Sequence, residues 1–96
     1  MKSIVIMRVE IKDSDKLKDY QSIAPKIISD YEGKILARGG DVITFEGPEE
    51  YRRIIVIEFP NIDKANAFYQ SQEYQDAIKL RQSAADFEII GVECLV

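Results

Sequence analysis

Three arginines, Arg8, Arg38 and Arg52, stand at the ends of segments that have the alternating apolar pattern of β-strands. If the first two strands run parallel with the third antiparallel between them, the three guanidinium groups meet on one face at one end of a sheet. Planar guanidinium donors suit a carboxylate or a phosphate. The sequence therefore predicts a pocket for a small anionic molecule. The alternative interpretation is that each arginine pairs with a nearby carboxylate, with the candidates Glu10, Asp41, Glu46 and Glu50.

Acid–base chemistry in this chain depends on Asp, Glu, Tyr and Lys, because the sequence has no His and a single Cys, Cys94. One chain therefore lacks the usual His/Cys metal sites and any Cys–His or Ser–His pair, and we expect no metal and no cofactor. Glu58 is the best candidate for a general acid or base, with a salt bridge across a dimer as the alternative. We expect Tyr69 and Tyr74 to pack in the core. The alternative is that their hydroxyl groups point into a pocket.

The composition excludes several classes of protein. A formal charge of -4 and a pI of about 4.8 argue against binding along a phosphate backbone, which needs clustered Lys and Arg, so we expect no nucleic-acid partner. No stretch approaches the roughly 18 apolar residues of a membrane span, and the first apolar run is too short for a signal peptide. One Cys forms no internal disulfide. We expect a cytoplasmic protein with a single domain over residues 1–96 and no membrane partner.

The apolar patterns predict the order β-α-β-β-α-β. This order is typical of a ferredoxin-like α+β sandwich with an antiparallel sheet in the order 4-1-3-2 and the helices on one face. The predicted strands are 3–11, 34–38, 52–59 and 87–95, the first helix is 14–32, and a short extended piece is 42–46.

Capping side chains, a proline and a glycine predict where the helices begin, bend and end. The second helix is expected in two parts, capped by Asn61 or Asp63 and then by Ser71. Pro25 predicts a kink or a break in the first helix, and Gly33 is expected as its left-handed C-terminal cap.

The two faces of the predicted sheet differ. From Val5 onward, the odd-numbered residues in the first three strands are apolar apart from Arg53, so they must face the helices. The even-numbered positions are half apolar: Ile4, Ile6, Arg8, Leu36, Arg38, Arg52, Ile54, Val56 and Glu58. An apolar patch of this size is unusual on a monomer, and a second copy covers it most simply because a two-fold contact uses one patch twice. The sequence therefore predicts a homodimer.

Several motifs, taken together in their order and spacing, are similar to those of a known family. They are Leu36-Ala37-Arg38-Gly39-Gly40, Glu46-Gly47, Ile57-Glu58-Phe59-Pro60, and Phe68-Tyr69-x-Ser71-x-Glu73-Tyr74-Gln75 followed by Arg81 and Ala84-Ala85. The chain resembles, nearly end to end, the uncharacterised family called domain of unknown function 1330. That resemblance implies a dimeric ferredoxin-like α+β barrel. Relatives of this fold include cofactor-free monooxygenases and muconolactone-isomerase-like enzymes, with sites between helices and sheet or at the barrel mouth.

The resemblance also marks single positions. Arg38, Gly39, Gly40, Glu58, Ser71, Tyr74 and Arg81 fall in the recurring motifs, while Phe68 stands where many members have Trp. The candidate ligand-binding residues are therefore Arg8, Arg38, Gly39, Gly40, Arg52, Tyr69, Ser71 and Arg81, and the candidate catalytic residues are Glu58 and Tyr74.

The predicted function is the binding of a small anionic molecule by a homodimer, with or without a cofactor-free reaction. Two alternatives are left open. One is a non-catalytic dimerisation or regulatory module, and the other is a cofactor-independent monooxygenase or isomerase, which rests on the fold alone.

Overall fold

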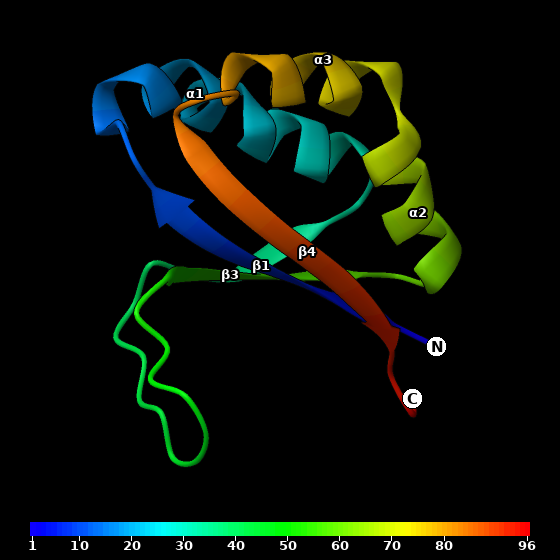
Figure 1. Ribbon diagram of the computed structural model, residues 1–96. Helices are drawn as coiled ribbons and strands as arrows, with labels where there is room; N and C mark the ends of the chain where they lie inside the picture. The colour runs from blue at the N-terminus through cyan, green and yellow to red at the C-terminus, as the bar shows by residue number, and fades with distance from the viewer.

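Four antiparallel strands form one sheet, and all the helices lie on one side of it (Figure 1). The computed structural model describes residues 1–96. The strands are β1 (Ser3–Ile11), β2 (Lys34–Arg38), β3 (Arg53–Phe59) and β4 (Ala85–Glu93), and the helices are α1 (Ser14–Asp30), α2 (Ile62–Gln70) and α3 (Gln72–Leu80). The strand order is β2-β3-β1-β4. The predicted α+β sandwich and its sheet order are therefore confirmed.

The core lies between the helices and the sheet. Odd-numbered residues of β1 and β3 point into it, and Met7, Val9, Ile57 and Phe59 are at most 2% exposed. One apolar stripe of each helix packs against them, because an amphipathic helix and a two-faced strand both bury one side. The expected inward face of these two strands is confirmed.

Side-chain caps fix the beginning of each helix. Asp13 accepts a hydrogen bond from the Lys16 amide at 3.2 Å at the start of α1. Asn61 accepts one from Lys64 at 2.7 Å at the start of α2. Ser71 ends α2 and caps α3, so the predicted two-part helix is confirmed. None of the helices has the length and apolar character needed to cross a membrane.

Of the kink or break predicted at Pro25, the break is absent, because α1 continues through the proline as one helix. Ala24 and Ile27 are buried on either side of the proline and hold both halves of the helix on the same core, which offsets the lost backbone donor. The left-handed residue after the helix is Glu32, with φ of 65°, rather than Gly33.

β2 contains a bulge that overturns one expectation about its faces. The register pairs Ile35 with Ile57, then Ala37 with Val56 and Arg38 with Ile55. Leu36 is therefore an extra residue, and beyond it the side chains point to the face opposite from the one that strict alternation predicts. Arg38 shares the helix-side face with Ile55. The predicted convergence of Arg38 with Arg8 and Arg52 on one face is wrong.

The ends of the other segments also differ from prediction. Residues 39–52 form an irregular loop that hangs below one end of the sheet in Figure 1, on the side away from the helices. The expected extended piece at 42–46 is wrong, because no strand lies beside it to share hydrogen bonds. β3 begins at Arg53 instead of Arg52, and β4 spans Ala85–Glu93 instead of 87–95.

Gly33 offers a test of the packing between α1 and the sheet. A Cβ at this position would lie 2.6 Å from Ile28 Cγ2 and 2.8 Å from Phe59 Cε1. We expect Gly33→Ala to lower the free energy of unfolding by about 1–3 kcal/mol through overpacking, measured by urea unfolding. Gly40→Ala is the matched control, because no atom lies within 4 Å of the added Cβ. Equal losses for the two substitutions would contradict the close packing at Gly33.

Candidate functional site

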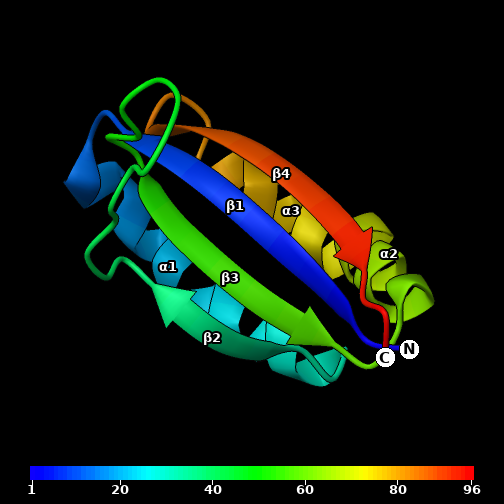
Figure 2. The ribbon, with the colours of Figure 1, turned by 90° about the horizontal axis from the view of Figure 1, so that it is seen from below.

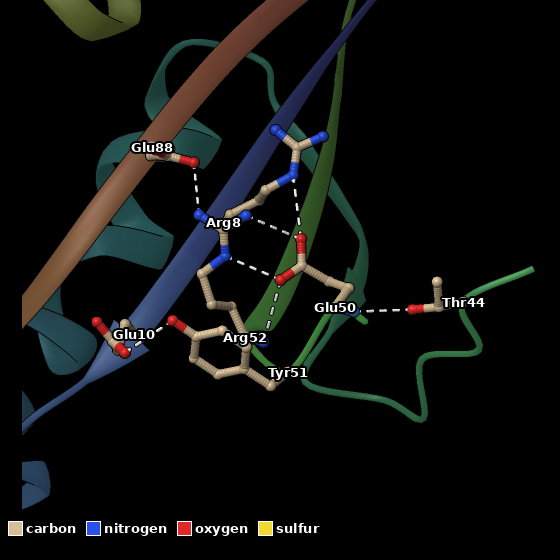
Figure 3. Close-up of polar contacts among 7 residues, drawn as sticks. All are labelled: Arg8, Glu10, Thr44, Glu50, Tyr51, Arg52 and Glu88. Carbon is tan, nitrogen blue, oxygen red and sulfur yellow. Dashed lines mark hydrogen bonds and ion pairs between the residues drawn. The ribbon is translucent and has the colours of Figure 1, made fainter. Parts of the chain in front are cut away.

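Two of the candidate arginines take part in an ion-pair network on the open face of the sheet, the face away from the helices (Figure 3). Arg52 Nε donates to Glu50 Oε2 at 2.8 Å, and Arg8 Nε lies 3.4 Å from the other oxygen of Glu50. Arg52 also contacts Glu88. Hydrogen bonding from Arg52 holds the pKa of Glu50 below its usual value. Arg8 and Arg52 therefore have carboxylate partners, as the alternative interpretation expects.

Arg38 lies on the helix-side face together with Arg53. Both line a cavity of about 380 Å³ between α1 and the strands β2 and β3, which we call the Arg38–Arg53 cavity. Its other lining residues are Met7, Tyr20, Gln21, Ala24, Pro25, Ile28, Ile35 and Ile55. No carboxylate oxygen comes within 4.0 Å of either guanidinium group. Two cations without counter-ions on one cavity suit an anion.

Gly39 lets Arg53 approach the backbone. Its φ of +70° favours glycine, and its amide donates to Ile54 O at 3.0 Å. A Cβ at Gly39 would lie 2.4 Å from Arg53 Nη1, so the guanidinium group occupies the space that any other residue would fill. The candidate Gly40 has open space around it instead.

The two candidate catalytic residues are on opposite sides of the sheet. Glu58 is on the open face beside Ile4, and its carboxylate lies 3.5 Å from Lys2 Nζ. Tyr74 is fully buried in the helix layer. They therefore do not share a site. No group of three or more His, Cys, Asp or Glu residues is placed to hold a metal ion.

A buried pair of tyrosines joins α1 to α3. The hydroxyl groups of Tyr20 and Tyr74 are 2.6 Å apart. Burial raises the pKa of Tyr20 above its usual value, and the neighbouring Tyr74 raises it further. The fold therefore keeps the Tyr20 hydroxyl neutral, as a hydrogen-bonding group beside the Arg38–Arg53 cavity.

Ser71 and Tyr69 have different roles at the joint between α2 and α3. Ser71 Oγ donates to Phe68 O at 2.8 Å and accepts from the Tyr74 amide at 3.1 Å. The Ser71 hydroxyl group therefore bonds to the backbone of the fold both as a donor and as an acceptor. Tyr69 is 38% exposed and lines a second cavity.

This second cavity, of about 460 Å³, lies between α2 and β4 and contains Arg81 in its wall. We call it the Arg81 cavity. Arg81 is only 9% exposed, and its Cζ lies 3.8 Å from the centroid of the Phe87 ring. Arg38 and Arg81 are thus placed at two separate cavities on the same side of the sheet.

Sequence reasoning missed Arg53 as a site residue. The signal was present, because Arg53 is the one charged residue among the odd-numbered, helix-facing positions of the first three strands. The contact of Tyr20 with Tyr74 and its place beside a cavity depend on the packing of α1 against α3.

The chain matches the family described as domain of unknown function (DUF1330) over residues 2–95. It belongs to this family. No curated protein matches the chain in sequence.

Several solved structures share the fold of this DUF1330 protein. The RPA0582 protein of unknown function from Rhodopseudomonas palustris is 18% identical, with a TM-score of 0.78 over 99% of this chain and 83% of that one. A dimeric ferredoxin-like protein of unknown function from Jannaschia sp. CCS1 is 12% identical, with a TM-score of 0.74 over 98% and 100% of the two chains. SnoaB, a cofactor-independent oxygenase from Streptomyces nogalater, is 5% identical, with a TM-score of 0.68 over 99% and 94%. At these identities the likeness shows the fold alone.

The buried Tyr20 hydroxyl predicts a loss of stability in alkali. The pKa of Tyr20 in the folded protein is above its usual value of 10.0, so its contribution to the free energy of unfolding is complete below pH 10. Above pH 10 that contribution is lost, because the tyrosine of the unfolded chain ionises first. The loss approaches about 1.4 kcal/mol per pH unit. We expect wild-type stability to fall more steeply from pH 9 to pH 11 than that of Tyr20→Phe, measured by urea unfolding. Tyr69→Phe is the control and should follow the wild type. If the wild type and Tyr20→Phe lost stability equally over this pH range, the raised pKa of Tyr20 would be refuted.

Proposed function

We propose that this protein is a homodimer that binds a small anionic molecule in the Arg38–Arg53 cavity. The distribution of counter-ions carries the proposal. Arg8 and Arg52 are ion-paired on the open face, whereas the two arginines of the cavity have no carboxylate partner. Two guanidinium groups together suit a doubly charged anion such as a phosphate or a dicarboxylate.

The walls of the Arg38–Arg53 cavity also suit an organic ligand. Met7, Ala24 and Ile28 supply apolar surface, while Tyr20 and Gln21 supply polar groups. A volume of about 380 Å³ is in the usual range for small-molecule sites. The anionic group would meet the arginines, and an apolar body would pack between α1 and the sheet.

Thermal unfolding with inorganic phosphate and with succinate, at constant ionic strength, tests this site. A ligand that binds only the folded protein raises the Tm by roughly 5 °C or more at a tenfold excess over its Kd. We expect Arg38→Ala and Arg53→Ala to lose most of that increase. Lys18→Ala, which removes an exposed cation of α1, should keep it.

The proposal fails if wild type and Arg38→Ala respond alike to every anion. A dimer that responds to none of them supports the alternative of a non-catalytic dimerisation module. The proposal stops at binding, because Glu58 and Tyr74 do not share a site and no contact favours an oxygenase or isomerase reaction.

We propose that the two chains of the homodimer pack together through their open faces. Figure 2 looks onto this face and shows the strands in front of the helices, with only the loop of residues 39–52 near one end. The face carries a continuous apolar set: Ile4, Ile6, Ile54, Val56, Ile90 and Val92. Ile90 and Val92 are 51% and 55% exposed in one chain. The structural neighbour from Jannaschia is described as dimeric, which supports a second copy as the cover.

Light scattering tests the dimer. We expect the wild type to have twice the 11.0 kDa mass of one chain at micromolar concentration. Ile6→Lys places a charge at the centre of the open face and should give the monomer mass. Ile23→Lys, on the exposed side of α1, is the matched control and should remain a dimer. A monomer mass for the wild type would overturn this part of the proposal.

A further inference from the structure

Arg81 is a buried cation without a counter-ion in the wall of the Arg81 cavity. Its side chain is 9% exposed, its Nε is fully buried with no hydrogen-bond partner, and no carboxylate oxygen lies within 4.0 Å. A buried charge is unfavourable unless it is paired. We propose that the Arg81 cavity binds a small molecule that has an apolar body and one carboxylate group.

The fold holds Arg81 in place before any ligand arrives. Its amide donates to Ile78 O at 3.1 Å at the end of α3, and its carbonyl oxygen accepts from the Ala84 and Ala85 amides at 3.1 and 3.3 Å. The guanidinium group lies over the Phe87 ring at 3.8 Å from the centroid. The guanidinium group is also close enough to the Tyr20 hydroxyl to offset part of the rise in the pKa of that group. Its five N–H donors lie in one plane, so those not directed at Tyr20 can meet a ligand. A pre-ordered donor makes binding less costly in entropy.

The walls of the cavity define the rest of the ligand. Of the lining residues, Val5, Ile62, Phe68 and Ile89 supply apolar surface, and Arg81 is the only charged one. One guanidinium group neutralises one carboxylate through two parallel hydrogen bonds. A phosphate dianion would leave a second negative charge against apolar walls, which is unfavourable. The chemistry therefore favours an aromatic or short-chain monocarboxylic acid.

This site is distinct from the Arg38–Arg53 cavity. The two cavities share no lining residue. Tyr20 lines the Arg38–Arg53 cavity, and its ring centroid is 5.3 Å from Arg81 Cζ, so the tyrosine lies between the two arginine sites. The ligand class also differs, since one site offers two cations and the other a single cation in an apolar wall. The inference therefore goes beyond the proposed function and does not depend on it.

Gly91 provides a way to block the Arg81 cavity without removing the charge. It lines the cavity from β4, and a Cβ there would lie 3.8 Å from Ile62 Cδ1 and from Val5 Cγ2, an ordinary contact distance. A side chain at this position therefore fits at its first atom and extends into the cavity. Gly91→Leu should fill the space that the ligand body needs.

Isothermal calorimetry with phenylacetate and hexanoate tests the proposal. The matched neutral probes are phenylacetamide and hexanamide, and inorganic phosphate is the third class, all at constant ionic strength. We expect at least one carboxylate to bind the wild type, and its amide to bind at least about tenfold more weakly because the charge-assisted pair is lost. Phosphate should not compete with the carboxylate.

Four variants locate the binding. Arg81→Met keeps the length and apolar contact of the side chain and should weaken carboxylate binding at least about tenfold. Gly91→Leu should abolish it by filling the cavity, and the two variants act independently, so a folding defect in one does not decide the test. Arg38→Ala should bind the carboxylate like the wild type, which separates this site from the proposed function. Lys18→Ala is the surface control and should also bind normally.

A spectroscopic measurement reports on Arg81 directly. In protein with ¹⁵N-labelled arginine, the Nε–H signal that disappears in Arg81→Met should shift on addition of the carboxylate, while the other arginine signals stay in place. The proposal is overturned if neither carboxylate binds the wild type, if the amides bind as tightly as the acids, or if Arg81→Met binds as the wild type does. In the first case Arg81 is a structural cation stacked on Phe87.

Discussion

β2 carries one residue more than the stretch of β3 with which it pairs, and the arrangement of charge on both faces of the sheet depends on this bulge. Because side chains alternate along a strand, one extra residue at Leu36 turns Arg38 from the open face to the helix side. Arg38 then shares a cavity with Arg53 instead of meeting Arg8 and Arg52. Without the bulge, three arginines would compete for the carboxylates of one face.

The open face is left with charges that balance one another. One carboxylate, that of Glu50, contacts both Arg8 and Arg52, and the amide of the same residue donates to Thr44 Oγ1 at 2.8 Å (Figure 3). Glu50 and Glu88 together therefore balance the two arginines, and Glu50 also ties the end of the irregular loop to the sheet. Ile43 and Phe45 are exposed apolar residues of this loop, and the loop lies on the side of the sheet away from the helices (Figure 1). A face that is apolar with paired charges at its ends suits another protein surface better than a small anion.

The helix side has the opposite character, because the arginines of its two cavities have no carboxylate partner. Arg38 and Arg53 line one cavity and Arg81 lines the other, with the Tyr20–Tyr74 pair close by. The break at Ser71 contributes to this layout. It separates α2 from α3, so that Tyr74 turns into the core while Tyr69, only five residues earlier, reaches the Arg81 cavity. The same joint thus supplies a core residue and a cavity wall.

The sequence by itself determined the element order, the sheet order and the inward faces of β1 and β3, because these follow from local periodicity and from the small number of ways to pack two helices on four strands. It also determined the cap at Ser71 and limited the cap of α2 to Asn61 or Asp63, because a cap depends on a side chain reaching an amide three residues away. Family membership followed from motifs spread along the chain.

Only the tertiary structure decided which arginines have partners. The bulge at Leu36 depends on hydrogen-bond register between β2 and β3, and strict alternation along one strand contains no sign of it. The burial of Arg81 depends on α2, α3 and β4 packing around it, although the sequence marked the residue through its motif. Local patterns set the direction in which a strand or a helix presents its side chains, whereas the pairing of a charge is a property of the distant segments that surround it.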